Sequence, residues 1–573
     1  NTERVLREKK APIMVVIGNP PYNVGQRSEN DNNKNRKYAI VDERVQKTYA
    51  KDSRASNKNA LGDVYVKFFR WAVDRLQGRD GIVCFVSNNS FIDQIAFDGM
   101  RKHLQQEFTE VYHLDLHGNI RKNPKLSGTT HNVFGITLGV GITIAIRSSQ
   151  HTERHLWYYR VPEFWRKTEK LAFLTQKQSF HNIEWELLQP DENYTWLTEG
   201  MRPEFKTFLP LGTKETKSKR AVIEPTTIFS NYGRGVATCR DDWAYDFDRN
   251  KLITKITRHI GTYNGEVDRW RRRGTDATSV DNFVLYDDTK IKWSRDLKLD
   301  LQRGHYAVYA DSKIRRTFYR PFCMQWLFFD RILNEEVYKL PIAFPISAHI
   351  QNVVICLTDL GSEKPFMVLA SSTIADLHLV GAGCGTECFP FYTYAEDGSN
   401  RRENITDWAL GQLRAKYGED VTKWDIFHYV YAMLHHPQYR ERYAENLKRD
   451  LPHIPLLKSG EAFRVCVRIG RELMALHLGY EQAKEYPLKW VENADVPFSW
   501  RVEKMRLAAD RDSLVVNDSL TLAGIPEECL RYRLGNRSAL EWVIDQYQVS
   551  EDKRSGIVSD PNNADDEEYI VRL

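Results

Sequence analysis

The sequence predicts an α/β protein with a doubly wound sheet at its N-terminal end, a mixed α/β region after it and a helical region at its C-terminal end. Three observations favour this fold class. Apolar strand-like runs alternate with helical patterns over residues 1–150, the alternation fades beyond residue 200, and helical periodicity dominates beyond residue 400. Such alternation is typical of a mainly parallel sheet covered by helices. With 573 residues, two to four domains are expected.

The first elements follow from the spacing of apolar residues. "IMVVIG" is a continuous apolar run and predicts a buried strand that ends at Gly18. "DVYVKFFRWAVDRL" predicts a helix, because Val64, Phe68, Ala72 and Leu76 recur every four residues. The sequence that follows predicts a strand at "GIVCFVS", a helix at "DGMRKHLQQEF", a strand at "EVYHLDL", and a pair of strands bent at glycines in "NVFGITLGVGITIAI".

The remaining chain divides into two further predicted domains. We expect domains at 1–200, 201–400 (mixed α/β, with short strands and turns) and 401–573 (helical). "VTKWDIFHYVYAMLHH" predicts a helix that begins with a capping box, Thr422 with Asp425, and stops at Pro437. The tail "SDPNNADDEEYIVRL" is acidic and is expected to be loosely held.

Composition narrows the class of protein. No run approaches 18 apolar residues, so no membrane-spanning helix is expected. The eight cysteines are scattered along the chain, and only Cys384 and Cys388 are close to each other. No second cysteine pair or histidine partner has the spacing of a zinc site, so no metal site is predicted. Isolated, reduced cysteines are typical of a cytoplasmic protein, and this location is favoured. The formal net charge of +5 permits nucleic-acid binding without demonstrating it.

The segment "GNPPY" directly follows the first predicted strand, and ligand sites in such sheets lie at the carboxyl ends of strands. Pro20 and Pro21 fix the backbone and remove two N–H donors, which leaves carbonyl oxygens to accept from another group. Asn19 adds a side-chain carbonyl, and Tyr22 adds a flat ring. The segment suits a planar amino group or carboxamide, although an Asn-Pro pair also forms ordinary turns.

Accepting both amino hydrogens favours a tetrahedral nitrogen, whose lone pair is then free to attack an electrophilic methyl group. "GNPPYN" resembles the fourth motif of the S-adenosylmethionine-dependent amino-methyltransferases that methylate adenine in DNA. Longer segments resemble single-chain type ISP restriction–modification enzymes up to about residue 545, among them "HNVFGITLGVGITI", "YRPFCMQWLFFD", "GSNRRENITDWAL" and "IFHYVYAMLHHPQYRERYAENLKRDLPHIPL". The resemblance implies part of a Rossmann-like class I methyltransferase sheet, a target recognition domain, and site-specific methylation of adenine N6 in double-stranded DNA.

The resemblance also implies roles for single residues. Asn19 and the Pro20 carbonyl would accept the two amino hydrogens of adenine, and Tyr22 would stack on the base once it is flipped out of the duplex. Pro21 would contact the methionine end of the cofactor. Phe68 is a candidate contact for the cofactor adenine, and Phe134 for the second face of the base; each could instead be an ordinary core residue. Asp63 and Asn88 are more simply explained as cap residues.

The family pattern also implies parts that this sequence does not contain. Only 18 residues precede Asn19, and they hold neither a glycine-rich cofactor loop nor an acidic ribose-binding residue. We therefore expect most of the S-adenosylmethionine site, together with a nuclease and a helicase, upstream of this chain or in another chain.

Basic residues beyond residue 200 are candidate DNA phosphate contacts, although charge runs are commonly just solvated surface. They are Lys217, Lys219, Arg220, Arg269, Arg271, Arg272, Arg273, Arg401 and Arg402. Two other functions remain open. Protein-glutamine methyltransferases share the NPPY segment but are expected to lack a long basic C-terminal region, and the chain could also be a DNA-binding specificity module without activity of its own.

Overall fold

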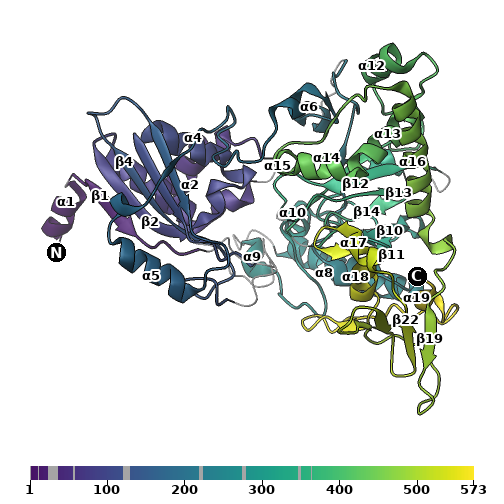
Figure 1. Ribbon diagram of the computed structural model, residues 1–573. Coiled ribbons are helices and arrows are strands. Elements are labelled where there is room, and N and C mark those ends of the chain that lie inside the picture. Colours follow the sequence, from purple (N-terminus) through teal and green to yellow (C-terminus); the bar gives the residue numbers. More distant parts are fainter. Residues whose placement is uncertain are drawn as a thin grey trace. The chain divides into compact units, whose positions relative to one another are not determined.

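The computed structural model describes residues 2–10, 12–22, 37–55, 58–120, 129–218, 224–273, 279–345, 350–362, 364–381 and 383–573. The chain forms two compact units, one containing the described residues up to Gly200 and the other running from Met201 to Leu573. Figure 1 follows the chain through both units. Among the described residues no helix is long and apolar enough to cross a membrane. The division into three domains stays a prediction.

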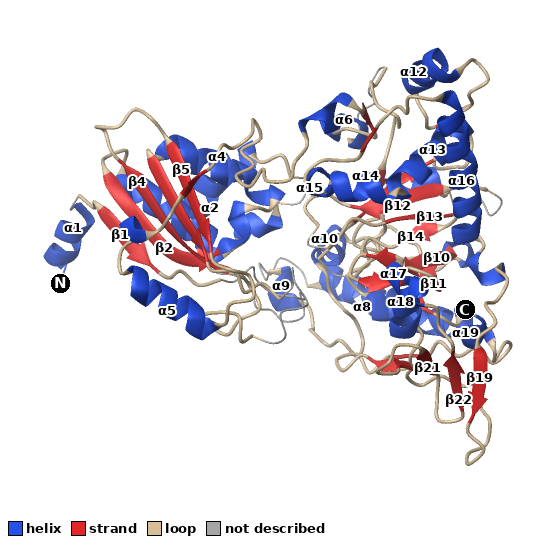
Figure 2. Ribbon diagram, in the orientation of Figure 1, coloured by secondary structure: helices blue, strands red, loops and turns tan. Residues whose placement is uncertain are grey.

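The first unit is built on a six-stranded sheet of order β1-β2-β4-β3-β5-β6 (Figure 2). β1 is parallel to β2 and β3 is parallel to β5, whereas β4 is antiparallel to both of its neighbours. The strands are β1 Val15–Gly18, β2 Gly81–Asn88, β3 Glu110–Asp115, β4 Val140–Arg147, β5 His155–Arg160 and β6 Glu186–Leu187. The predicted α/β class is confirmed for this unit.

Helices cover both faces of this sheet. They are α2 Ala39–Val45, α3 Val64–Leu76, α4 Asp98–Glu107 and α5 Lys167–Lys177. A further helix, α1 Thr2–Lys10, precedes β1, and its residues 3–7 are exposed. One core packs α3 and α4 against one face, with Phe69 edge-on to Phe85 of β2. A smaller core on the other face includes Phe173 of α5. α3 begins where the sequence predicted, and the Asp63 side chain caps it by accepting from the Tyr65 N–H.

The predicted pair of strands in "NVFGITLGVGITIAI" is wrong. Only β4, from Val140, is a strand; residues 131–139 form turns. The physical reason is tertiary: the buried Asn132 side chain binds four backbone groups of this segment and its surroundings, which competes with strand pairing. Gly135 adopts φ +69°, a left-handed conformation that suits a turn.

The central part of the second unit holds two four-stranded sheets, β14-β10-β11-β9 and β13-β12-β15-β8, and a third lies nearer the C-terminus. Their strands are β8 Gly233–Arg234, β9 Tyr245–Asp246, β10 Ile314–Arg320, β11 Cys323–Phe328, β12 Val354–Thr358, β13 Val368–Ser371, β14 Ile374–Ala375 and β15 Thr386–Pro390. The principal helices are α8 Arg249–Arg272, α10 Arg295–Arg303, α12 Asp407–Tyr417, α13 Lys423–His435, α14 Pro437–Arg442, α15 Ala444–Leu447 and α16 Gly460–Leu478. The largest core combines Phe389 with Phe427 and so takes residues from both sides of residue 400.

The helical C-terminal prediction holds only as far as Leu478. The capping box of Thr422 and Asp425 at the start of α13 is confirmed. Beyond Leu478 the chain forms a sheet of short strands, β19 Lys489–Glu492, β22 Leu520–Ala523, β21 Ser513–Val515 and β20 Arg506–Leu507. The acidic tail is packed, because Ile570 of α19 Tyr569–Arg572 is buried in the core beneath this sheet. Strands of two to four residues carry too little periodicity to predict.

Candidate active site

The predicted acceptor segment lies at the carboxyl end of β1. The Tyr22 hydroxyl donates to Asn19 Oδ1 at 2.9 Å and lies 3.2 Å from the Val86 carbonyl oxygen of β2. Asn19 and Pro21 are exposed, and Pro20 is buried. A side-chain carbonyl oxygen has two lone pairs, so Asn19 Oδ1 keeps one for a further donor. Among the described residues no N–H or hydroxyl binds the Pro20 carbonyl oxygen.

Tyr22 is a fixed part of this segment. Its ring is half-buried and packs against the cores on both faces of the sheet. Burial raises the pKa of Tyr22 to about 12, so the hydroxyl stays protonated at neutral pH and remains a donor. The hydrogen bond from this hydroxyl therefore fixes the position of the Asn19 amide oxygen without a charged group.

Several strand ends converge on this edge of the sheet. β1 and β2 end here, as does β3 at Asp115, and β4 begins here, because Asn88 pairs with Val140 and Asp115 with Gly141. Asn88 is a cap residue, as expected: its side chain accepts from the Ser90 N–H. The sheet topology places the NPPY segment and the turns that precede β4 at the same edge.

Phe134 lies in those turns, and 49% of its surface is exposed. It is therefore not a core residue. Its neighbours Val133 and Ile136 pack into the same small core that Tyr22 contacts. The structure thus brings Phe134 to the edge that holds Asn19 and Tyr22, and its stacking role stays a prediction.

Phe68 lies on α3 with 38% of its surface exposed. Its ring lies 6.4 Å from that of Trp71, in an edge-on arrangement. Phe68 is therefore not an ordinary core residue. Its exposed ring is available for contact with another group. Its contact with a cofactor stays a prediction.

Among the basic residues predicted to contact DNA, Lys217 is bound inside the second unit. It forms an ion pair with the buried Glu387, and burial lowers the pKa of its ammonium group. Arg401 and Arg402 are exposed: Arg401 lies over the Tyr392 ring, and Arg402 donates to Asn400 Oδ1 at 3.2 Å. Lys219 and Arg220 lie outside the described residues.

The arginines around Trp270 lie at the C-terminal end of α8 and differ in their partners. Arg269 pairs with Glu266 at 2.6 Å, Arg271 donates to the Gly304 carbonyl oxygen at 2.6 Å, and Arg273 lies over the Trp270 ring. Among the residues that the structure describes, the exposed Arg272 donates only to the Asp268 carbonyl oxygen of its own helix, at 3.3 Å. Arg272 is thus the arginine of this group with most of its donors available.

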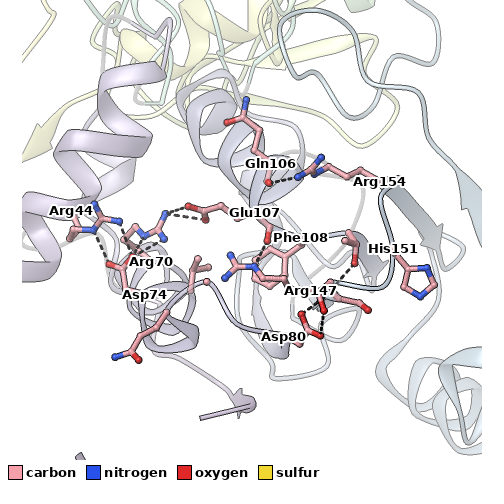
Figure 3. A pocket seen from close by; sticks show the side chains of 16 residues that line it. Arg44, Arg70, Asp74, Asp80, Gln106, Glu107, Phe108, Arg147, His151 and Arg154 are labelled. Carbon is pink, nitrogen blue, oxygen red and sulfur yellow. Dashed lines mark hydrogen bonds and ion pairs between the residues drawn. The ribbon is translucent and has the colours of Figure 1, made fainter. Parts of the chain in front are cut away.

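A pocket of about 630 Å³ lies at the opposite edge of the first sheet, where β2 begins and β4 ends. Figure 3 shows Arg44, Arg70, Asp74 and Glu107 joined in one ion-pair network. Next to it, Arg147 donates to the Glu107 carbonyl oxygen and Arg154 to the Gln106 carbonyl oxygen. The pocket contains none of the residues predicted to act in catalysis.

The sequence analysis missed the buried polar residues that support the site, Asn89, Asp115 and Asn132. The position of Asn132 two residues before Phe134 was the only available signal. No group of three or more His, Cys, Asp or Glu side chains within the described ranges is arranged to hold a metal ion. Cys388 faces Cys356 rather than Cys384, with 4.0 Å between the sulfur atoms.

Comparison with protein families gives two matches. The Eco57I restriction-modification methylase family matches residues 8–118, and the Type ISP C-terminal specificity domain matches residues 227–573. The first match contains the NPPY segment and α3, and the second covers most of the second unit. No curated protein matches the chain.

Among the solved structures that match, three are similar over the whole chain. They are a nuclease-deletion mutant of the Type ISP restriction-modification enzyme LlaGI in complex with a DNA substrate mimic (34% identity, TM-score 0.87), a DrdV–DNA complex (37%, 0.85) and the ATP-dependent Type ISP restriction-modification enzyme LlaBIII bound to DNA (30%, 0.88). The chain spans 52%, 56% and 36% of those chains. It therefore belongs to the Type ISP restriction–modification family, of which it contains a methylase domain and the C-terminal specificity domain.

Proposed function

We propose that this chain carries the base-binding side and the target-recognition part of an S-adenosylmethionine-dependent methyltransferase that acts on adenine N6 at a specific site in duplex DNA. The observation that carries the proposal is the geometry of Asn19: its Oδ1 accepts from the Tyr22 hydroxyl at 2.9 Å, keeps a second lone pair for a further donor, and belongs to an exposed residue at a strand end. The solved relatives are DNA complexes, which supports a DNA substrate. We propose that the reaction takes place in the cytoplasm.

In the proposed reaction Asn19 Oδ1 and the Pro20 carbonyl oxygen accept the two amino hydrogens of a flipped adenine, and the Tyr22 ring stacks on it. Accepting both hydrogens concentrates the lone pair on N6. When bound, S-adenosylmethionine supplies a methyl group on a sulfonium. N6 would take up that methyl group, and the surplus proton would leave N6 by way of the Asn19 or Pro20 oxygen to water. The step depends on the position of the amino group and on the polar oxygens that bind it, not on a strongly basic residue.

The described residues fit one side of the cofactor. Pro21 and Phe68 offer exposed apolar surface. β1 is the outer strand of its sheet, and Met14, Val15 and Ile17 on or beside it are 66%, 57% and 76% exposed. Exposed apolar residues on an edge strand favour pairing or covering by further structure. We propose that most of the cofactor site, and the nuclease and helicase parts, are supplied by residues outside this chain.

For the DNA contacts, the exposed Arg272, Arg401 and Arg402 are the strongest proposals, because no carboxylate among the described residues pairs with them. Lys217, Arg269, Arg271 and Arg273 already have internal partners and are weaker ones. Each arginine that neutralises a phosphate contributes to the salt dependence of binding. Replacing Arg402 with Gln is expected to weaken binding to all sequences and to reduce the slope of log K against log salt by about 1.

Methyl transfer by the full-length protein tests the acceptor role. Asn19→Ala is expected to lower kcat by about 10²–10³-fold, the size found when one such polar contact is removed from a transition state. Tyr22→Phe keeps the ring but frees the amide oxygen and is expected to have a smaller effect. The measurement is transfer of labelled methyl from S-adenosylmethionine to duplex DNA. Near-normal transfer by Asn19→Ala would contradict the mechanism.

Two assays separate the other functions. Incubation with release-factor protein in place of DNA tests a protein-glutamine methyltransferase, which would label the protein. Equilibrium dialysis of this chain alone with S-adenosylmethionine tests the division of the cofactor site. Full-affinity binding would show that the site does not depend on further residues.

A further inference from the structure

The turns that present Phe134 are held by one buried side chain. Asn132, 1% exposed, accepts from the Phe134 N–H at 2.9 Å and from the Ile136 N–H at 3.4 Å through Oδ1. Its Nδ2 donates to the Leu138 carbonyl oxygen at 2.5 Å and to the Gly118 carbonyl oxygen at 3.3 Å. All four bonds of this amide therefore go to the backbone, three of them to Phe134 and the residues that follow it and one to the turn after β3.

The turn after β3, which contains the Asn132 partner Gly118, is itself held in place by hydrogen bonds and close packing. Asp115 at the end of β3 accepts from the His117 N–H at 2.7 Å and from Asn89 Nδ2 at 2.5 Å. A Cβ on Gly118 would lie 2.8 Å from the His131 carbonyl oxygen, and Gly118 has φ +87°. The turn after β3 can approach Asn132 closely only because residue 118 is glycine. Asn132 is thus anchored on a rigid edge of the sheet.

The result is an exposed ring on a fixed loop. Val133 and Ile136, on the two sides of Phe134, pack into the core that Tyr22 also contacts, while half of the Phe134 surface faces outward. A residue that stacks on a base benefits from this arrangement, because a ring already in position loses less entropy when the base arrives. Loss of the Asn132 amide would free the Phe134 backbone without removing the ring.

We propose that Asn132 is a positioning residue of the methyl-transfer reaction: it holds Phe134 where the ring packs against the flipped purine, opposite the Tyr22 side. This inference rests on the proposed function and adds a residue that acts only through Phe134. Its ligand is the target base, a planar aminopurine, and Asn132 itself touches neither base nor cofactor.

A double-mutant cycle in the full-length protein tests the proposal. The substrate is duplex DNA with the recognition site, which is first read from the positions methylated in the host. Phe134→Ala is expected to lower kcat/KM by about 5- to 150-fold, the loss of one stacking contact. Asn132→Ala is expected to lower kcat/KM by no more than Phe134→Ala does, at least about 3-fold, when Phe134 is present, and less than 2-fold when residue 134 is already alanine.

A second readout follows the base itself. With 2-aminopurine in place of the target adenine, Asn132→Ala and Phe134→Ala are both expected to weaken the fluorescence change that accompanies capture of the flipped base. The matched control is Asn562→Ala, which removes an amide that accepts from the Val502 N–H at 2.8 Å and donates to the Val502 carbonyl oxygen at 2.9 Å. It is expected to change neither readout.

Equal losses for Asn132→Ala in both backgrounds would overturn the proposal and leave Asn132 as a residue that only stabilises the loop. Melting temperatures of all four proteins identify a variant that fails to fold; Asn132→Ser then replaces Asn132→Ala, and the cycle is repeated. Asn19→Ala measured in parallel separates the two claims. If it retains methyl transfer, the proposed function fails; if it loses transfer and the cycle is additive, only the role of Asn132 fails.

Discussion

At the scale of single residues, the segment that we propose as the acceptor consists of neutral groups. Asn19, Pro20 and Tyr22 carry no charge at neutral pH, and burial raises the pKa of Tyr22 to about 12. The reaction proposed for this segment therefore depends on the direction of lone pairs rather than on a general base. We expect kcat to show no ionisation of Tyr22 below pH 10, which a pH profile of methyl transfer measures; a fall that the Tyr22→Phe substitution abolishes would contradict this.

Two buried histidines make folding depend on pH. Burial lowers the pKa of His113 to about 4 and that of His259 to about 3, so the folded protein keeps both neutral. In the unfolded chain each binds a proton near pH 6.5. Their stabilisation is complete above pH 6.5 and is lost as the pH falls toward 4, by roughly 1.4 kcal/mol per pH unit for each histidine. Denaturant unfolding at pH 7 and pH 5 measures this, and His113→Gln is expected to weaken the dependence. An unchanged dependence would argue against a neutral buried His113.

At the scale of elements, local signals predicted structure well and long-range contacts did not. The starts of α3 and α13 were predictable because Asp63 and Thr422 cap helices within four residues of sequence. The turns before β4 were not, because Asn132 binds Gly118 across 14 residues. The same holds at the site: the NPPY segment is contiguous and was found, whereas Asn89 and Asp115 meet only after folding.

Helical glycines give a second test at this scale. A Cβ at Gly265 in α8 meets nothing within 4 Å, whereas one at Gly470 in α16 would lie 2.0 Å from the His428 carbonyl oxygen of α13. Gly265→Ala is expected to stabilise the second unit by up to about 1 kcal/mol through helix propensity. Gly470→Ala is expected to destabilise it by about 1–3 kcal/mol, because α13 and α16 must separate. Chemical denaturation measures both, and equal effects would contradict the close packing of these helices.

At the scale of the whole molecule, the chain combines a sheet that presents an acceptor segment at one edge with a larger specificity region that matches its family over 227–573. The α/β class was predictable from alternation in the first 150 residues. The C-terminal sheet was not, because its strands are short and its core includes Tyr547 and Ile570 from distant parts of the chain.

The central claim is that the Asn19 segment methylates adenine at N6, and the identity of the product base tests it most directly. The full-length protein is incubated with S-adenosylmethionine and DNA, and the DNA is digested to nucleosides for mass spectrometry. We predict N6-methyldeoxyadenosine that disappears with Asn19→Ala. Methylated cytosine in its place, or methylated adenine that persists in Asn19→Ala, would contradict the claim.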